Sequence, residues 1–288
     1  MGKGAFNRIK GDVGNILAME HVNVTVPDQG LATLFYVNGL GLTRDPYIDF
    51  GTFNVWINAG RQQFHLPTAE AQVLRGRTGL VVPDLQSLSR RLARITGRLE
   101  GTRFGFTERR QFTDVTCPWG NQIRCHAPGR FGNMQLGIPY VEFTVPTGTA
   151  SGIAAFYSEV MGCRTRTTAR QCEVFVGQGQ VLRFRESTRA NQHYDGHHIA
   201  IYIADFSGPH TWLDRAGLIS EESDECQYRF QHIVDPSSGR LLFEIEHEVR
   251  SLFHPMWERH LVNRNAEQSF FHYQKDRDAF TPGKLPTG

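Results

Sequence analysis

The sequence of 288 residues lacks the features that identify several large classes of protein. Its five cysteines form no C-x-x-C pair, and their odd number without regular spacing argues against a disulfide framework. No apolar run is long enough to cross a membrane, and the polar N-terminal segment is too short for a signal sequence. These absences predict a soluble, cytoplasmic protein with reduced thiols.

The sequence also lacks an excess of charge of one sign. With 31 basic and 29 acidic residues the formal net charge is +2, and no basic run resembles a tract that binds a polyanion. Glycine-rich phosphate loops, Ser-His-Asp arrangements and zinc-finger spacings are missing as well. The composition therefore argues against nucleic acids and membranes as partners.

What the sequence does contain is a strand pattern that carries an imidazole. From His198 to Ile203, apolar residues alternate with side chains of a different kind, which is typical of a strand with two unlike faces. The segment 241–247 repeats this pattern, with apolar residues on one face and Glu244 and Glu246 on the other. A strand that buries one face must pair, hydrate or give a cation to the carboxylates on its opposite face.

The same order of elements recurs four times along the chain. Each unit has a strand, a break of the Val-Pro-Asp type, an amphipathic helix and about three further strands. The clearest internal match aligns YVEFTVPTGTASGIAAFYSEVMGCRTR, from Tyr140, with HVNVTVPDQGLATLFYVNGLGLTR, from His21. Self-similarity of this kind indicates a repeated supersecondary unit.

Each unit is about 55 residues long and cannot bury its sheet face alone, so we expect the units to pair. Pairing of neighbours predicts two similar domains, at 15–130 and 135–250. An extension at 251–288 follows no period, and we expect it to pack over the second domain or a neighbouring subunit. Its aromatic residues and the sheet edges also favour a homodimer.

These four units resemble the vicinal oxygen chelate superfamily, which includes glyoxalase I, fosfomycin and bleomycin resistance proteins and extradiol dioxygenases. The resemblance covers about residues 15–250, and four units in one chain are most similar to the two-domain extradiol dioxygenases. It implies an α+β fold of four βαβββ modules paired into two half-barrel domains. In this superfamily a half-barrel of two units holds a divalent metal, whose ligands come from the first and last strands of the units.

Aligning the four breaks assigns residues to the ligand positions that the resemblance implies. Six residues before each break, on the first strands, stand His21, Arg77, Tyr140 and His198. An apolar-to-polar step aligns the last strands and assigns His65, His126, Arg185 and either Glu244 or Glu246. Arg77 and Arg185 are also candidates for binding a substrate carboxylate, because a guanidinium group can bind it through two hydrogen bonds.

These positions define two alternative metal sites. The second domain offers His198 with Glu244 or Glu246, completed by Tyr140 or by Glu142, which lies two residues further on the same strand face. The first domain offers His21, His65 and His126. One histidine with carboxylates favours Fe2+ or Mn2+, whereas three histidines favour Zn2+, Ni2+ or iron, so the divalent metal stays open with Fe2+ or Mn2+ preferred.

The sequence departs from the extradiol pattern at the first strand of the second domain, where Tyr140 replaces the histidine that the resemblance implies. An acid-base role then passes to His232, His197 or Tyr202. We expect a metal-dependent, dioxygenase-like enzyme that acts on a small-molecule substrate with vicinal oxygens. A glyoxalase-like lyase or isomerase and a metal-free small-molecule-binding protein of the resistance type are the alternatives.

Overall fold

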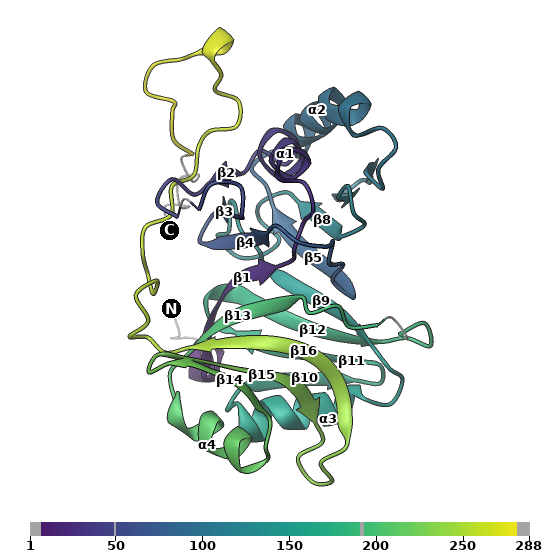
Figure 1. Cartoon of the computed structure of the whole chain (residues 1–288), viewed down its shortest axis with the longest axis vertical. Helices are drawn as coiled ribbons and strands as arrows, with labels where there is room; N and C mark the ends of the chain where they lie inside the picture. The colour runs from purple at the N-terminus through teal and green to yellow at the C-terminus, as the bar shows by residue number, and fades with distance from the viewer. Residues whose placement is uncertain (1–6, 49, 191–192, 281–288) are drawn as a thin grey trace, which may run out of the picture.

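The structure is a computed structural model, and it describes residues 7–48, 50–190 and 193–280. In this part of the chain, sixteen strands form two curved sheets of eight strands each, with the helices on the outer faces (Figure 1). The four units predicted from the repeat are all present.

Each unit has a strand, a helix and three further strands. The first unit consists of β1 (Ile16–Asn23), α1 (Gln29–Thr33), β2 (Thr43–Arg44), β3 (Asn54–Ala59) and β4 (Gln62–Pro67). The second consists of β5 (Gly76–Val81), α2 (Leu85–Ile95), β6 (Gly105–Glu108), β7 (Phe112–Thr116) and β8 (Gln122–His126). The third consists of β9 (Tyr140–Val145), α3 (Ala150–Ala155), β10 (Arg164–Thr168), β11 (Gln171–Val176) and β12 (Gln180–Glu186). The fourth consists of β13 (His198–Ile203), α4 (Ser207–Arg215), β14 (Ile219–Asp224), β15 (Gln227–Val234) and β16 (Leu241–Arg250).

Short helical turns complete these elements. Helices α1 and α3 continue as π-helical turns at Leu34–Gly39 and Phe156–Val160. The 3-10 turns are Arg8–Gly11, Thr96–Leu99, Gly177–Gly179 and Phe270–His272.

The Pro-Asp breaks start helices in the first two units. Asp28 caps α1 by accepting a hydrogen bond from the Leu31 backbone N–H at 2.9 Å. Asp84 caps α2 in the same way, with the Ser87 N–H at 2.6 Å. An aspartate at this position satisfies a backbone donor that the first helical turn leaves without an intrahelical partner. The local sequence therefore determines where these helices begin.

The two sheets do not pair the units in the way that the sequence predicted. One sheet has the order β14-β15-β16-β13-β1-β4-β3-β2, and the other has β10-β11-β12-β9-β5-β8-β7-β6. The first unit thus shares a sheet with the fourth, and the second shares a sheet with the third. The expectation that consecutive units form each half-barrel was wrong, whereas the boundaries 15–130, 135–250 and 251–288 stay predictions.

The reason lies in the strand order within a unit. The first strand of each unit occupies one edge of its four strands, so it pairs with the first strand of another unit. Here β1 pairs antiparallel with β13, and β5 pairs antiparallel with β9. Because the four first strands have similar sequence patterns, the repeat alone does not specify which two of them meet. We call the sheet of the first and fourth units the first half-barrel and the other sheet the second half-barrel.

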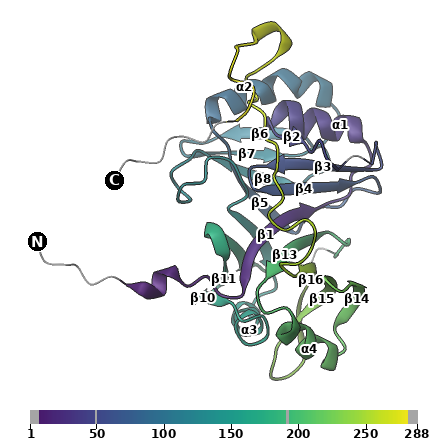
Figure 2. The same ribbon diagram turned by 90° about the vertical axis from the view of Figure 1, so that its left-hand side faces the viewer.

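The C-terminal extension crosses from the fourth unit back to the first (Figure 2). The Asn58 side chain donates to the Val262 carbonyl at 2.9 Å, and the Asn263 side chain bonds the Gly60 N–H and carbonyl at 3.0 and 2.9 Å. Further along, Arg91 on α2 pairs with Glu267 at 2.6 Å. Within residues 251–280, the expected packing over the second domain is found at the start of the extension, where Trp257 contacts Tyr202. Residues 281–288 of the predicted extension lie outside the described residues.

Two features noted in the sequence, the cysteines and the lack of long apolar runs, can be followed in the described residues. All five cysteines lie in this part of the chain and carry free thiols, four of them buried. Across residues 7–48, 50–190 and 193–280, the helices are too short or too polar to span a membrane. The cytoplasmic location and the homodimer stay predictions.

Candidate metal centre

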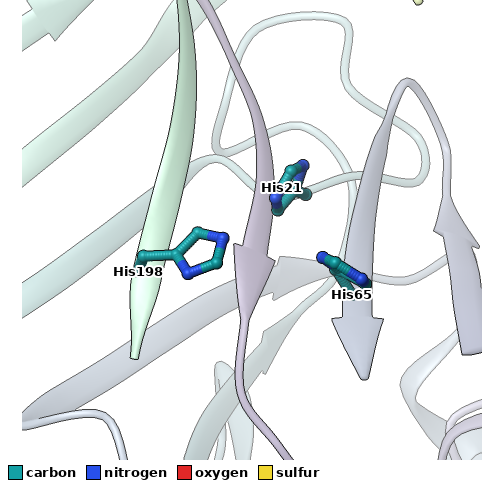
Figure 3. A group of neighbouring side chains, drawn as sticks. All are labelled: His21, His65 and His198. Carbon is teal, nitrogen blue, oxygen red and sulfur yellow. The ribbon is translucent and has the colours of Figure 1, made fainter. Parts of the chain in front are cut away.

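Three imidazoles from three neighbouring strands meet inside the first half-barrel. His21 lies on β1, His65 on β4 and His198 on β13, and one ring nitrogen of each lies within 4.8 Å of the others (Figure 3). Strand β1 lies between the other two strands, and its Asn23 is opposite both His65 and His198 in the pairing register. The cluster therefore depends on a contact between the first and the fourth units.

The ring nitrogens of this cluster lack ordinary partners. Nε2 of His21, Nε2 of His198 and both ring nitrogens of His65 are buried without a hydrogen-bond partner among the described residues. Buried polar atoms are normally hydrogen-bonded, so several unsatisfied nitrogens at one point indicate a missing ligand. Burial holds the pKa of His21 well below 6.5 and lowers the pKa of His65 to about 2. Both rings are thus neutral at physiological pH, which is the form that binds a metal.

A glutamate from the fourth unit lies beside the three imidazoles. Glu248 on β16 lies opposite Ala200, which in turn lies opposite His21, so the small alanine separates the carboxylate from the imidazole. Glu248 Oε2 lies 3.6 Å from His198 Nε2. Burial raises the pKa of Glu248, but the contacts with His198 and Arg250 outweigh this effect and hold the pKa below its usual range. Glu248 is therefore ionised beside the imidazoles.

A second set of charged side chains surrounds the cluster. Glu20 accepts a hydrogen bond from His21 Nδ1 at 3.0 Å, and Glu246 Oε1 lies 3.5 Å from His198 Nδ1. Arg229 contacts Glu246 and Glu248 at 2.6 and 2.7 Å, and Arg250 pairs with both Glu20 and Glu248. When all five groups are ionised, carboxylates exceed guanidinium groups by one. The surroundings therefore favour a cation at the cluster.

An aromatic wall bounds the cluster on the side of β3. The Trp56 indole stacks on the His65 ring with centroids 3.9 Å apart, and it meets the His21 ring edge-on at 4.9 Å. Trp56 is buried. This wall limits the movement of His65, whose ring nitrogens have no other support in the described chain.

Comparison with known proteins supports the architecture. No protein-family model matches the sequence, and no curated protein matches it. Among solved structures, a "putative dioxygenase" from Bacillus subtilis covers 82% of this chain with 86% of its own, at 16% identity and a TM-score of 0.56. Glyoxalase I from Zea mays covers 84% with 94% of its own, at 13% identity and a TM-score of 0.52.

This chain has the vicinal oxygen chelate fold. The predicted α+β class, with four βαβββ modules paired into two half-barrels, is thus confirmed. Identities of 13–16% establish the fold and carry no activity to this chain.

In this vicinal oxygen chelate fold the imidazole cluster takes members from both sites that the sequence proposed. His21 and His65 belonged to the alternative site of the first domain, and His198 belonged to the site of the second. The sequence identified all three histidines but divided them between two sites, because it paired consecutive units. The pairing of the first unit with the fourth unites them.

Of the other predicted ligands, Glu246 lies beside the three imidazoles, and Glu244, Tyr140, Glu142 and His126 lie apart from them. Glu246 is beside the cluster, between His198 and Arg229, but Glu244 instead lies near Gln231 and His232, at 3.5 and 3.6 Å. Tyr140, Glu142 and His126 all belong to the second half-barrel. There the Tyr140 hydroxyl shares a hydrogen bond of 3.0 Å with His126 Nε2.

Of the five predicted acid-base and substrate-binding residues, one lies close to the cluster. Tyr202 is close to the site, because its hydroxyl donates to Glu20 at 3.1 Å and accepts from Arg250 at 3.3 Å. The other four candidates lie elsewhere. His197 is buried against Asp195 at 2.6 Å, His232 is beside Glu244, Arg77 pairs with Glu142 at 3.3 Å, and Arg185 is exposed on β12.

The sequence analysis missed Glu248 because it aligned the last strands by their apolar-to-polar step. The pairing of each last strand with its first strand gives a different alignment. In the structure, the residue two places after each first-strand position faces its last strand: Asn23 pairs with His65, Gly79 with Arg124, Glu142 with Arg183 and Ala200 with Glu248. The sequence alignment chose His126, Arg185 and Glu244 or Glu246 instead, an error of two or four residues. The alternation Glu244, Glu246, Glu248 on one strand face was the available clue.

Proposed function

We propose that the protein binds one divalent metal through His21, His65, His198 and Glu248, and that it is a metal-dependent enzyme acting on a small substrate with vicinal oxygens. The observation that carries this proposal is the convergence of three imidazoles, each with one ring nitrogen within 4.8 Å of the others and each with a buried ring nitrogen that has no partner among the described residues. A buried cluster with surplus negative charge around it, in which His21 and His65 are neutral, matches what a divalent cation requires.

The donor set favours a transition metal. Three imidazole nitrogens and one carboxylate oxygen suit Fe2+ or Mn2+, with Zn2+ and Ni2+ as alternatives, and exclude a preference for Mg2+ or Ca2+, which take oxygen ligands. Bound there, the metal would supply a Lewis acid and a template for two adjacent oxygens of a substrate, such as a catechol or a 2-hydroxycarbonyl compound.

The burial of the residues around the cluster determines from which side a substrate can reach it. His21, His198 and Glu248 are buried, whereas His65, Arg229 and Glu246 are only half-buried. A substrate therefore reaches the cluster from the side of His65 and Glu246. Trp56 excludes water from the opposite face of the His65 ring. Glu20 and Glu246 contact the Nδ1 atoms of His21 and His198, which leaves the Nε2 atoms directed toward the ligand position.

Metal analysis of purified protein tests the proposal directly. Protein from a culture supplemented with iron, manganese, zinc and nickel is expected to contain one metal per chain, and the His198→Ala variant is expected to contain none. Turnover of catechols with consumption of oxygen would then identify dioxygenase chemistry. Wild-type protein that stays free of metal under these conditions would contradict the proposal.

A lyase or isomerase reaction is the second candidate, and Glu246 favours it. This carboxylate is half-buried, next to His198 and accessible from the substrate side, so it can accept a substrate proton. Such a reaction needs no oxygen. Equal turnover of a 2-hydroxycarbonyl substrate in aerobic and anaerobic buffer would support this candidate, whereas dependence on oxygen would exclude it.

A further inference from the structure

We propose that Glu20 is a positioning residue that selects the tautomer and the orientation of His21. The proposal rests on the metal site proposed above and adds a residue that does not itself touch the metal. It starts from the backbone of β1 and proceeds through the contacts of one buried carboxylate.

A β-bulge places Glu20 beside the cluster. Met19 is opposite Ile201, and His21 is opposite Ala200, so Glu20 is an extra residue without a partner on β13. In a regular strand the side chains of residues 20 and 21 would point to opposite faces. The bulge lets both side chains reach the same polar cluster, and bulges of this kind often redirect side chains next to active sites.

The Glu20 carboxylate is fully engaged in this cluster. Oε2 accepts from His21 Nδ1 at 3.0 Å and from Arg250, and Oε1 accepts from the Tyr202 hydroxyl at 3.1 Å. Its side chain is only 9% exposed, so water does not compete for these bonds. The carboxylate has little freedom to turn away from His21.

Arg250 connects this positioning residue to the proposed ligand Glu248. One guanidinium nitrogen of Arg250 binds Glu20, and the other binds Glu248. Its Nε donates to Gln227 at 2.9 Å, which holds the guanidinium plane in place. The carboxylates on the two sides of the metal position are therefore held by one buried cation.

The contact with Glu20 determines which nitrogen of His21 carries the proton. A carboxylate only accepts hydrogen bonds, so neutral His21 must carry its proton on Nδ1. Its Nε2 then presents a lone pair toward His65 and His198. Without the carboxylate, His21 can place the proton on Nε2, which blocks metal binding. A hydrogen-bond partner on the second ring nitrogen of a metal-binding histidine typically contributes 10–100-fold to metal affinity.

Two substitutions of Glu20 separate positioning from general loss of charge. Glu20→Gln keeps an oxygen that accepts from His21 Nδ1, whereas Glu20→Met has a similar size and cannot accept. The matched controls are Glu173→Gln and Glu173→Met in the second half-barrel. Glu173 also has a 9% exposed side chain, and it pairs with Arg183 at 3.2 Å and with Arg166.

The first measurement uses metal-free full-length protein. Nitrogen-15 NMR of the histidine rings, with the His21 signal assigned by its loss in His21→Gln, is expected to show the Nδ1–H tautomer in the wild type and in Glu20→Gln. Glu20→Met is expected to shift His21 toward the Nε2–H tautomer. An unchanged tautomer in Glu20→Met would overturn the proposal whether or not the protein binds metal.

The second measurement is the affinity for Co2+, followed by its visible absorption. We expect binding 10–100-fold weaker in Glu20→Met, a smaller loss in Glu20→Gln, and wild-type affinity in both Glu173 controls. Equal losses in the Glu20 and Glu173 variants would show a general effect of removing buried charge and would overturn the proposal. If Glu20→Met does not fold, an Nε2–H tautomer of His21 in Glu20→Gln would do the same, because glutamine keeps the accepting oxygen. Absence of Co2+ binding in the wild type would reject the metal site, and the tautomer of His21 would still decide the role of Glu20.

Discussion

The two half-barrels of this protein have the same strand order and equivalent inward positions, yet they carry opposite chemistry. In the first half-barrel these positions hold His21, His65, His198 and Glu248. In the second they hold Arg77, Arg124, Tyr140 and Arg183. Guanidinium groups stay protonated and do not bind metals, so the second half-barrel cannot hold a cation at these positions. The fold supplies the positions, and the residue types decide what each half-barrel binds.

The second half-barrel fills its interior with contacts of its own. Arg124 binds Asp114 through two hydrogen bonds of 2.7 and 3.0 Å, and the Arg183 guanidinium lies 4.2 Å from the centre of the Tyr140 ring. Tyr140 also bonds His126. Each polar side chain named here has a protein partner, although Nδ1 of His126 is itself buried without one, whereas in the first half-barrel four ring nitrogens of three neighbouring imidazoles lack partners among the described residues. This difference supports placing the proposed binding site in the first half-barrel.

The largest expected effect is on metal binding. Replacing the proposed ligand His65 by alanine should abolish binding of Co2+, because one of four donors is lost and Trp56 cannot replace it. The equivalent substitution in the second half-barrel, Arg124→Ala, should leave binding unchanged. Titration of both variants with Co2+ measures the contrast, and weakened binding in both would mean that the half-barrels are not functionally distinct.

The second largest expected effect is on stability. It is measured by removing the cation of a buried ion pair and that of a half-exposed ion pair. Arg250→Ala should lower the free energy of unfolding of metal-free protein by about 3–5 kcal/mol, because it leaves Glu20 and Glu248 buried without their cation. Arg124→Ala should lower it by about 1 kcal/mol or less, because Arg124 and Asp114 are partly solvated. Urea unfolding measures both losses. Similar losses would show that Arg250 and its carboxylates are no more shielded from water than Arg124 and Asp114.

A third prediction concerns the close packing of the second half-barrel. A Cβ atom on Gly79 would lie 2.4 Å from the Tyr140 ring, so Gly79→Ala must displace this ring and weaken its bond to His126. We expect a loss of about 1–3 kcal/mol in unfolding free energy, which is usual for overpacking. Affinity for Co2+ should not change. A Gly79→Ala variant as stable as the wild type would show that Tyr140 moves without cost.

The smallest effect is a dependence on pH that the half-barrels should share. Burial and the charges of Arg130, Arg124 and Arg183 lower the pKa of His126 to about 4, and burial lowers that of His65 to about 2. In the unfolded chain both should titrate near about 6.5. Between these values the unfolded state binds more protons, so the stability of metal-free protein must fall as pH decreases from about 6.5.

Unfolding at pH 7 and at pH 5 tests this dependence. The wild type should lose stability over this range, and His126→Gln should lose less by on the order of 1 kcal/mol. Glutamine retains a polar partner for the Tyr140 hydroxyl. Equal losses in the two proteins would show that His126 titrates in the folded state as it does in the unfolded chain.

The sequence by itself determined the repeated unit and the residue types of the site. Period-two alternation and the Pro-Asp breaks are local, so they predicted four βαβββ units, and helices α1 and α2 begin at the expected aspartates. The alignment of breaks also identified His21 and His198 as equivalent positions. These inferences depend on contacts between residues that are close in the chain.

Only the tertiary structure decided which units meet and how their strands align. Pairing of the first unit with the fourth depends on contacts between β1 and β13, which are separated by more than 170 residues in the chain. The parallel register that brings Glu248 to the cluster, and the bulge that turns Glu20 toward His21, depend on neighbouring strands as well. A repeated sequence makes several pairings locally equivalent, so the packing of the whole chain selects one of them.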